Sequence, residues 1–174
     1  TFVTGVMGII ASKFLPEFPI KLVFVGFIIT AFLLIFSNRQ GNKNASETNS
    51  TELSPISIKQ GLFVGFAQGI GTLPGISRSG ITISASLLAK IDRETAGEFS
   101  FLLSTPIVAA AVLVDITEFA LTSIPFWIGV LSSFIVGLIV VKFLMDYLKK
   151  GSFKVFAIYR ILLGILIFGV IFIR

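Results

Sequence analysis

The sequence predicts an all-α, multi-pass membrane protein, and three observations support that prediction. Hydrophobic residues make up 55% of the 174 residues, and 19 of these are Phe. Charged residues make up only 13%, whereas a soluble domain carries about 25%. Long stretches are almost free of charge, and a helix that crosses a bilayer needs about 20 mostly apolar residues. We therefore expect a single membrane domain over residues 1–174, located in the cell membrane.

The expected membrane-spanning helices follow from these charge-free stretches. They are Leu22–Asn38, Phe99–Val114, Phe119–Val141 and Val155–Ile173. Residues 1–12 resemble the tail end of a further span, and the chain begins with Thr1 inside an apolar run. We therefore expect sequence upstream of Thr1, with the domain incomplete at its N-terminus.

Residues 37–60 interrupt the apolar pattern. They are rich in Asn, Ser, Thr and Glu and show no hydrophobic periodicity, which predicts a hydrophilic loop. Basic residues collect on the cytoplasmic side of membrane proteins. Their distribution in this chain favours a cytoplasmic position for the loop.

Residues 61–89 are expected to form a re-entrant helix–loop–helix hairpin. Pro74 and Gly75 break the segment in the middle, because Pro lacks a helical N–H donor and constrains the residue before it. Each half would be only about 20 Å long as a helix, against a hydrocarbon core of about 30 Å. Neither half can cross alone, so the segment should enter and leave the membrane on one side.

Arg78 stands near the centre of this apolar segment. An arginine at membrane depth costs from about 3 to more than 10 kcal/mol unless it has an anionic partner or a wet cavity. No Asp or Glu lies between Glu52 and Asp92, so the local segment offers no counter-ion. A bound anion is therefore a candidate partner for Arg78.

The residues around Arg78 suit a phosphate group. Its planar guanidinium can bind two phosphate oxygens at once. The second half-helix begins near this point, so its free N–H groups and positive dipole end add to the site. Glycines let the backbone approach closely, and hydroxyl groups add donors. The residues that provide these groups are Gly75, Ser77, Ser79, Gly80 and Thr82.

Three assignments stay open at this point. Ser, Gly and Pro could form a simple turn, with Arg78 extending to the membrane surface. Gln68 either lines the site or binds a neighbouring helix. Arg160, the one charge in the last apolar stretch, is expected to extend to the surface, with a role in the site as the alternative.

The chain resembles the undecaprenyl-diphosphate phosphatase family, also known as the bacitracin-resistance proteins. Gly65–Gly69 and Leu73–Ser84 are similar to the family's second signature loop. Glu98–Leu103, followed by Pro106, resembles the next helix, and Phe156–Arg160 resembles the last span. The resemblance covers essentially all of residues 1–174.

The resemblance implies hydrolysis of undecaprenyl diphosphate to undecaprenyl phosphate and phosphate, on a fold built as an inverted repeat with two re-entrant hairpins. It implies catalytic roles for Ser77 and Arg78. The substrate would be bound by these two residues together with Gly75, Ser79, Thr82 and Gln68. A divalent cation, Mg²⁺ or Ca²⁺, is implied as cofactor, with its ligands mainly outside this chain and no metal ligand within it. The partners implied are a polyprenyl diphosphate and membrane lipids, and a homodimer is left open.

One departure from the family pattern limits what the chain should do. The family's first signature loop carries two glutamates, a serine and a histidine, and nothing here matches it; the chain has no His and no Cys. We expect a fragment that binds diphosphate without turning it over. An inactive homologue or a lipid-phosphate translocase on the same fold is the alternative. A nucleic-acid role is not expected, because the aromatic residues lie inside apolar runs.

Overall fold

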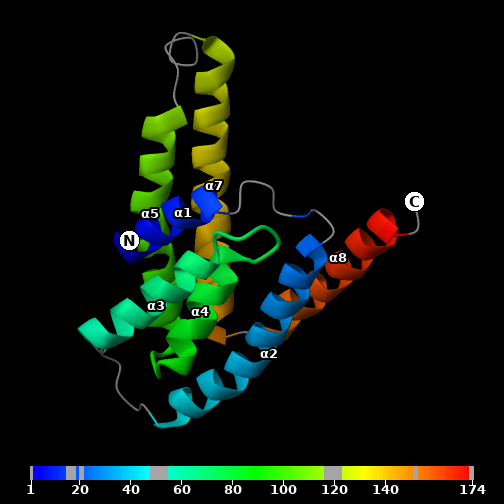
Figure 1. The fold of residues 1–174 in the computed structure, drawn as a ribbon. Helices are drawn as coiled ribbons and strands as arrows, with labels where there is room; N and C mark the ends of the chain where they lie inside the picture. The colour runs from blue at the N-terminus through cyan, green and yellow to red at the C-terminus, as the bar shows by residue number, and fades with distance from the viewer. Residues whose placement is uncertain are drawn as a thin grey trace.

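The computed structural model describes residues 2–14, 19, 22–47, 55–115, 123–150 and 153–172. Within them all regular secondary structure is helical and there is no strand (Figure 1). Four helices, α2, α5, α7 and α8, are long and apolar enough to cross a membrane, which confirms a multi-pass membrane protein. The described helices are α1 (Phe2–Phe14), α2 (Val23–Glu47), α3 (Ile58–Ile70), α4 (Arg78–Leu88), α5 (Arg93–Asp115), α7 (Ile124–Lys150) and α8 (Lys154–Phe172).

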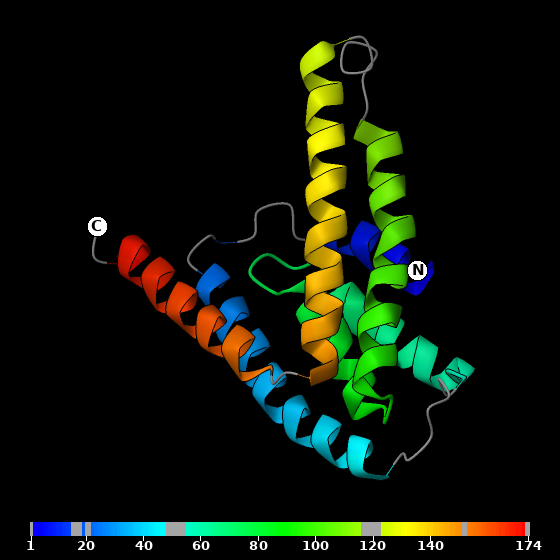
Figure 2. The same cartoon turned by 180° about the vertical axis from the view of Figure 1, so that it is seen from behind.

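The long helices form two antiparallel pairs, and α4 packs against a helix of each pair. Figures 1 and 2 show α5 beside α7, and α2 beside α8 at an angle to the first pair. The core lies around α4 and includes Leu34, Val64, Ile81 and Leu87. The outer faces of the long helices carry exposed Phe, Leu, Ile and Val side chains, most densely on α7. An apolar outer surface is what a lipid environment requires.

The polar stretch after the first span is helical for longer than the sequence predicted. The loop was expected to begin at residue 37, but α2 continues to Glu47. Ser37 and Asn38 are buried, and the Asn38 side-chain oxygen accepts hydrogen bonds from Arg93 (2.9 Å) and from the Phe153 N–H (3.3 Å). These tertiary contacts hold the first polar residues of the segment, Ser37 and Asn38, inside the helix bundle. Residues 48–54 of the expected loop lie outside the described residues.

Other helix ends also differ from the predicted boundaries. Helices α3 and α5 begin at polar capping residues that precede their apolar stretches. Helix α3 begins at Ile58 rather than Gly61, since Ser57 and Gln60 form a reciprocal capping box. The Asp92 carboxylate accepts from the Thr95 N–H at 2.9 Å, so α5 begins before the expected Phe99. Helix α7 runs on to Lys150, beyond the expected Val141. Its expected start at Phe119 lies outside the described residues.

The predicted break in residues 61–89 is confirmed. Helices α3 and α4, of 13 and 11 residues, are separated by residues 71–77, which contain Pro74 and Gly75. These helices are about 20 and 17 Å long at 1.5 Å per residue. Figures 1 and 2 show the connecting loop projecting towards the α2–α8 pair.

Gly75 is the tightest point of this loop. Its φ is +86°, and a Cβ atom there would lie 2.1 Å from the Val23 carbonyl oxygen. Gly26 on α2 faces the same contact, since its Cβ would lie 2.6 Å from the Gly75 carbonyl carbon. Two glycines thus let the loop backbone lie directly on α2.

We predict that Gly75→Ala destabilises the fold by about 2 kcal/mol or more, because the substitution forces a positive φ and a backbone clash. The measurement is the thermal unfolding midpoint in detergent. Gly61→Ala is the matched control, since its Cβ would meet nothing within 4 Å and alanine favours a helix by about 1 kcal/mol. An unchanged midpoint in Gly75→Ala would contradict the packing described.

Candidate anion-binding site

The N-terminus of α4 is built to present free N–H groups. Ser77 is its N-cap, with its Oγ accepting from the Gly80 N–H at 3.2 Å, and its carbonyl accepts from the Ile81 N–H at 2.9 Å. The first N–H groups of a helix have no intrahelical acceptor. Those of Arg78 and Ser79 therefore stay available, at the end of the helix that favours negative charge.

A polar pocket of about 400 Å³ lies beside this helix end. The loop and parts of α3, α4 and α5 form its walls. Its polar side chains come from Gln68, Thr72, Arg78, Ser79, Thr82, Ser100 and Ser104. No carboxylate lines it, so every charged group on its described wall is positive.

Two of these side chains offer donors without acceptors. The Arg78 guanidinium has no hydrogen bond or ion pair with any described residue. Gln68 is fully buried, and its Oε1 accepts from the Thr4 hydroxyl at 2.9 Å while its Nε2 has no partner. A buried donor without an acceptor costs about 1–3 kcal/mol. This cost applies to the buried Gln68 amide, and the half-buried Arg78 guanidinium adds positive charge, so both favour a ligand that accepts hydrogen bonds. Gln68 does both things that its sequence allowed: it lines the pocket and it binds α1.

Thr82 connects two helices that line the polar pocket. Its hydroxyl donates to the Arg78 carbonyl and accepts from the Ser100 hydroxyl at 3.1 Å. This links the first turn of α4 to α5. The expected contact between Thr82 and a phosphate stays a prediction.

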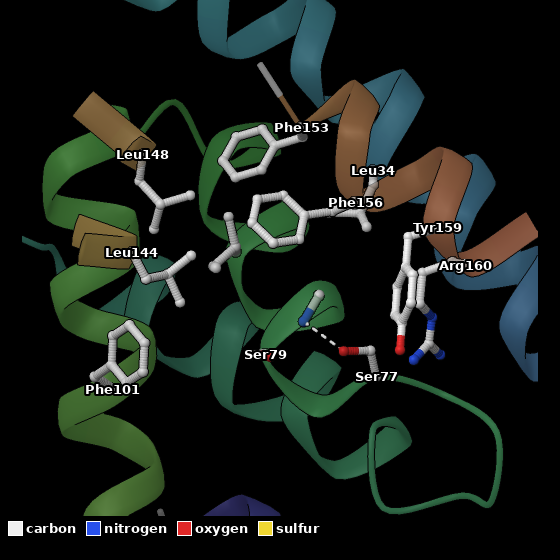
Figure 3. Close-up of a pocket in the computed structure, with 12 residues that line it drawn as sticks. Leu34, Ser77, Ser79, Phe101, Leu144, Leu148, Phe153, Phe156, Tyr159 and Arg160 are labelled. Carbon is white, nitrogen blue, oxygen red and sulfur yellow. Dashed lines mark hydrogen bonds between the residues drawn. The ribbon is translucent and has the colours of Figure 1, made fainter. Parts of the chain in front are cut away.

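An apolar pocket of about 200 Å³ lies on another side of the same helix end. Figure 3 shows Leu144, Leu148, Phe153 and Phe156 around it, with Ser77 and Arg160 towards one end. The two pockets share Ser79 and Phe101 on their walls. Ser79, at the N-terminus of α4, therefore stands between a polar and an apolar compartment.

The residues predicted from the sequence come together around this helix end. Gln68, Gly75, Arg78, Ser79 and Thr82 line the polar pocket, and Ser77 caps α4 and lines the apolar one. Sequence reasoning missed Thr30 and Ser100, which bind the site from α2 and α5. Both residues are distant from the loop in the chain, and nothing in a single sequence indicates that they contact it.

Arg160 corrects an expectation. It was expected to extend to the membrane surface, but its Nη2 donates to the Gly75 carbonyl at 2.6 Å. Its guanidinium also lies 4.1 Å from the centre of the Phe27 ring. The signal in the sequence was its isolation, as the one charge in the apolar stretch Val155–Ile173.

A divalent cation does not fit the described pocket. The wall offers hydroxyl, amide and carbonyl groups but no carboxylate, and a guanidinium faces it. Among the described residues no group of three or more His, Cys, Asp or Glu side chains could hold a metal ion. This wall suits an anion.

Comparison with known proteins shows to which family the chain belongs. Residues 1–166 match the family model of the bacitracin resistance protein BacA. The chain belongs to this family. BacA relatives named undecaprenyl-diphosphatase include one from Treponema denticola, 42% identical over 171 residues, which cover 95% of this chain and 61% of the relative. Another, from Halothermothrix orenii, is 38% identical over 172 residues, covering 94% of this chain and 64% of the relative.

A third relative of that name, from Moorella thermoacetica, is 44% identical over 125 residues, covering 71% of this chain and 48% of the relative. The BacA-family chain thus spans less than two thirds of the length of these three relatives.

We predict that Arg78→Ala weakens binding of inorganic pyrophosphate by about 10- to 100-fold, the loss expected for hydrogen bonds to a charged group. Isothermal titration of the purified chain in detergent measures this. Arg39→Ala is the matched control, because Arg39 is exposed on α2 away from the pocket lining. Equal affinities for Arg78→Ala and the unaltered chain would remove Arg78 from the site.

Proposed function

We propose that this protein hydrolyses undecaprenyl diphosphate to undecaprenyl phosphate and phosphate, and that residues 1–174 supply the part that binds the diphosphate. The observation that carries the proposal is the unpaired Arg78 guanidinium, in a polar pocket without a carboxylate at the N-terminus of α4. The names of the BacA relatives support this choice of anion. The same reaction recycles the lipid carrier for cell-wall synthesis.

In the proposed mechanism the guanidinium fork of Arg78 holds oxygens of the terminal phosphate. The free N–H groups of Arg78 and Ser79 bind the same group, and the Ser77 hydroxyl, whose oxygen caps α4, keeps its proton to donate. The backbone N–H donors are fixed by the capped start of α4 before the substrate arrives, so they stabilise the charge that develops as the phosphoryl group transfers. Gln68 Nε2 adds a donor from the buried side.

The prenyl tail is proposed to leave the site on its apolar side. The apolar pocket of Leu144, Leu148, Phe153 and Phe156 shares Ser79 with the polar pocket. A diphosphate bound by Ser79 can therefore keep its charged end among donors and its hydrocarbon among Leu and Phe side chains. Burial of each CH₂ group contributes about 0.8 kcal/mol.

The membrane arrangement belongs to the proposal as well. Helices α3 and α4 are shorter than the hydrocarbon core of about 30 Å, so we propose that they enter and leave on one side as a re-entrant hairpin. Their loop is then non-helical backbone at membrane depth, which requires protein or a water-filled cavity around it. The inverted repeat, the divalent cation with ligands outside these residues, and a homodimer stay predictions from the family resemblance.

The test is phosphate release from undecaprenyl diphosphate by the protein expressed from its complete open reading frame. We expect Arg78→Ala to lower kcat/KM by about 100-fold or more, a loss of roughly 3 kcal/mol of transition-state stabilisation. Arg78→Lys keeps the charge but loses the two-pronged guanidinium, so its kcat/KM should lie between those of Arg78→Ala and the parent protein. Arg39→Ala should match the parent protein.

Wild-type kcat/KM in Arg78→Ala would sink the assignment. A translocase would also use Arg78 but would release no phosphate. Movement of the lipid across proteoliposomes without phosphate release by the parent protein would therefore overturn the hydrolase in favour of transport.

A further inference from the structure

Arg160 is a half-buried cation that the proposed mechanism does not use. It lies in α8, 85 residues from Gly75, yet its Nη2 donates to the Gly75 carbonyl at 2.6 Å. Arg160 does not line the polar pocket of Arg78; it lines the apolar pocket, where Figure 3 shows it beside Tyr159 and near Ser77. Its contact is therefore with the loop and not with the phosphate compartment.

The Gly75 carbonyl needs such a donor. It belongs to a non-helical residue with φ of +86°, and the loop is packed so closely on α2 that no side chain fits at this position. The contact is part-buried, and the cost of leaving a carbonyl without a donor approaches about 1–3 kcal/mol as the group becomes fully buried. A guanidinium donor is among the strongest partners available, because its hydrogen bonds are charge-assisted.

The guanidinium is itself held in place. Its carbon lies 4.1 Å from the centre of the Phe27 ring, in the geometry of a cation–π contact. Its Nε is buried and has no hydrogen-bond partner. Phe27 and the Gly75 carbonyl therefore define the position of Arg160.

The same short segment is held from α2 as well. The Ser77 N–H donates to the Thr30 hydroxyl at 3.1 Å, and this hydroxyl donates to the Gly26 carbonyl at 2.8 Å. Residues 75–77 are thus held at one end by Arg160 and at the other by Thr30. Arg78 and the N-terminus of α4 follow directly, so their direction depends on these two contacts.

We propose that Arg160 is a positioning residue for the anion site. It fixes the Gly75 carbonyl on the α2–α8 pair and thereby aims Arg78 and the α4 N–H groups into the polar pocket. Its kinetic consequence rests on the proposed function, whereas its effect on the loop and on anion binding does not.

The first test compares Arg160→Met, which keeps the length and removes the donors, with Lys154→Met, an exposed cation on the same helix. The purified chain is examined by hydrogen exchange and by titration with inorganic pyrophosphate. In Arg160→Met we expect amide exchange in residues 72–80 to rise about tenfold and pyrophosphate affinity to fall about tenfold, with α7 unchanged. Arg160→Lys should recover part of both losses, and Lys154→Met should match the parent chain.

A milder variant covers the case in which Arg160→Met does not fold. Phe27→Leu removes the ring under the guanidinium, and we expect it to raise exchange in the same segment by about threefold. Weakened pyrophosphate binding with unchanged exchange at 72–80 would overturn the proposal in favour of direct contact. An equal rise in exchange throughout the chain would overturn it in favour of a general loss of stability.

The second test is a double-mutant cycle with Arg78→Ala, using the protein from its complete open reading frame. Arg160→Met alone should lower kcat about tenfold or more with a smaller change in KM, and it should add little once Arg78 is gone. Additive losses would contradict a role through Arg78. If no variant and no parent releases phosphate while the exchange and pyrophosphate results hold, the hydrolase proposal fails and the positioning role stands.

Discussion

The hydrogen-bonding needs of one short non-helical segment organise this structure. Residues 71–77 interrupt an otherwise apolar stretch, and their backbone groups cannot rely on a helix for partners. Part of the need is met locally, since the Thr72 N–H donates to the Gly69 carbonyl at 3.2 Å and the Leu73 N–H donates to the Ile70 carbonyl at 3.1 Å. Two more backbone groups have partners on the long helices. The Ser77 N–H donates to Thr30 of α2, and the Gly75 carbonyl accepts from Arg160 of α8.

The loop backbone has hydrogen-bond partners, whereas some donors in the polar pocket have none. The loop backbone is fixed by groups that face away from the polar pocket, while Arg78 and Gln68 Nε2 face it without acceptors among the described residues. The N–H groups at the start of α4 are held in advance, which favours an anion because less ordering is left for the moment of binding. In a BacA-family protein the lipid diphosphate is the anion we propose.

The long helices contribute in two ways. Their outer faces carry apolar side chains suited to lipid, and their inner faces carry the few polar groups that the loop and α4 need. Asn38, Arg93 and the Phe153 N–H join α2, α5 and α8 near one end of the molecule. That contact keeps α2 and α8 in register, and these are the two helices on which the loop rests.

Much of this protein follows from its sequence alone, because charge-free length, a Pro-Gly break and an isolated Arg78 are local signals. They determined four long apolar helices, a broken segment between the first two, and the residues that gather at the N-terminus of α4. Tertiary structure alone decided that α2 continues past residue 37 and that Asn38 is buried, since Arg93 and the Phe153 N–H bind its side chain. It also decided that Arg160 binds the loop rather than the membrane surface. That choice depends on a carbonyl 85 residues away, and no periodicity or spacing in the chain records such a contact.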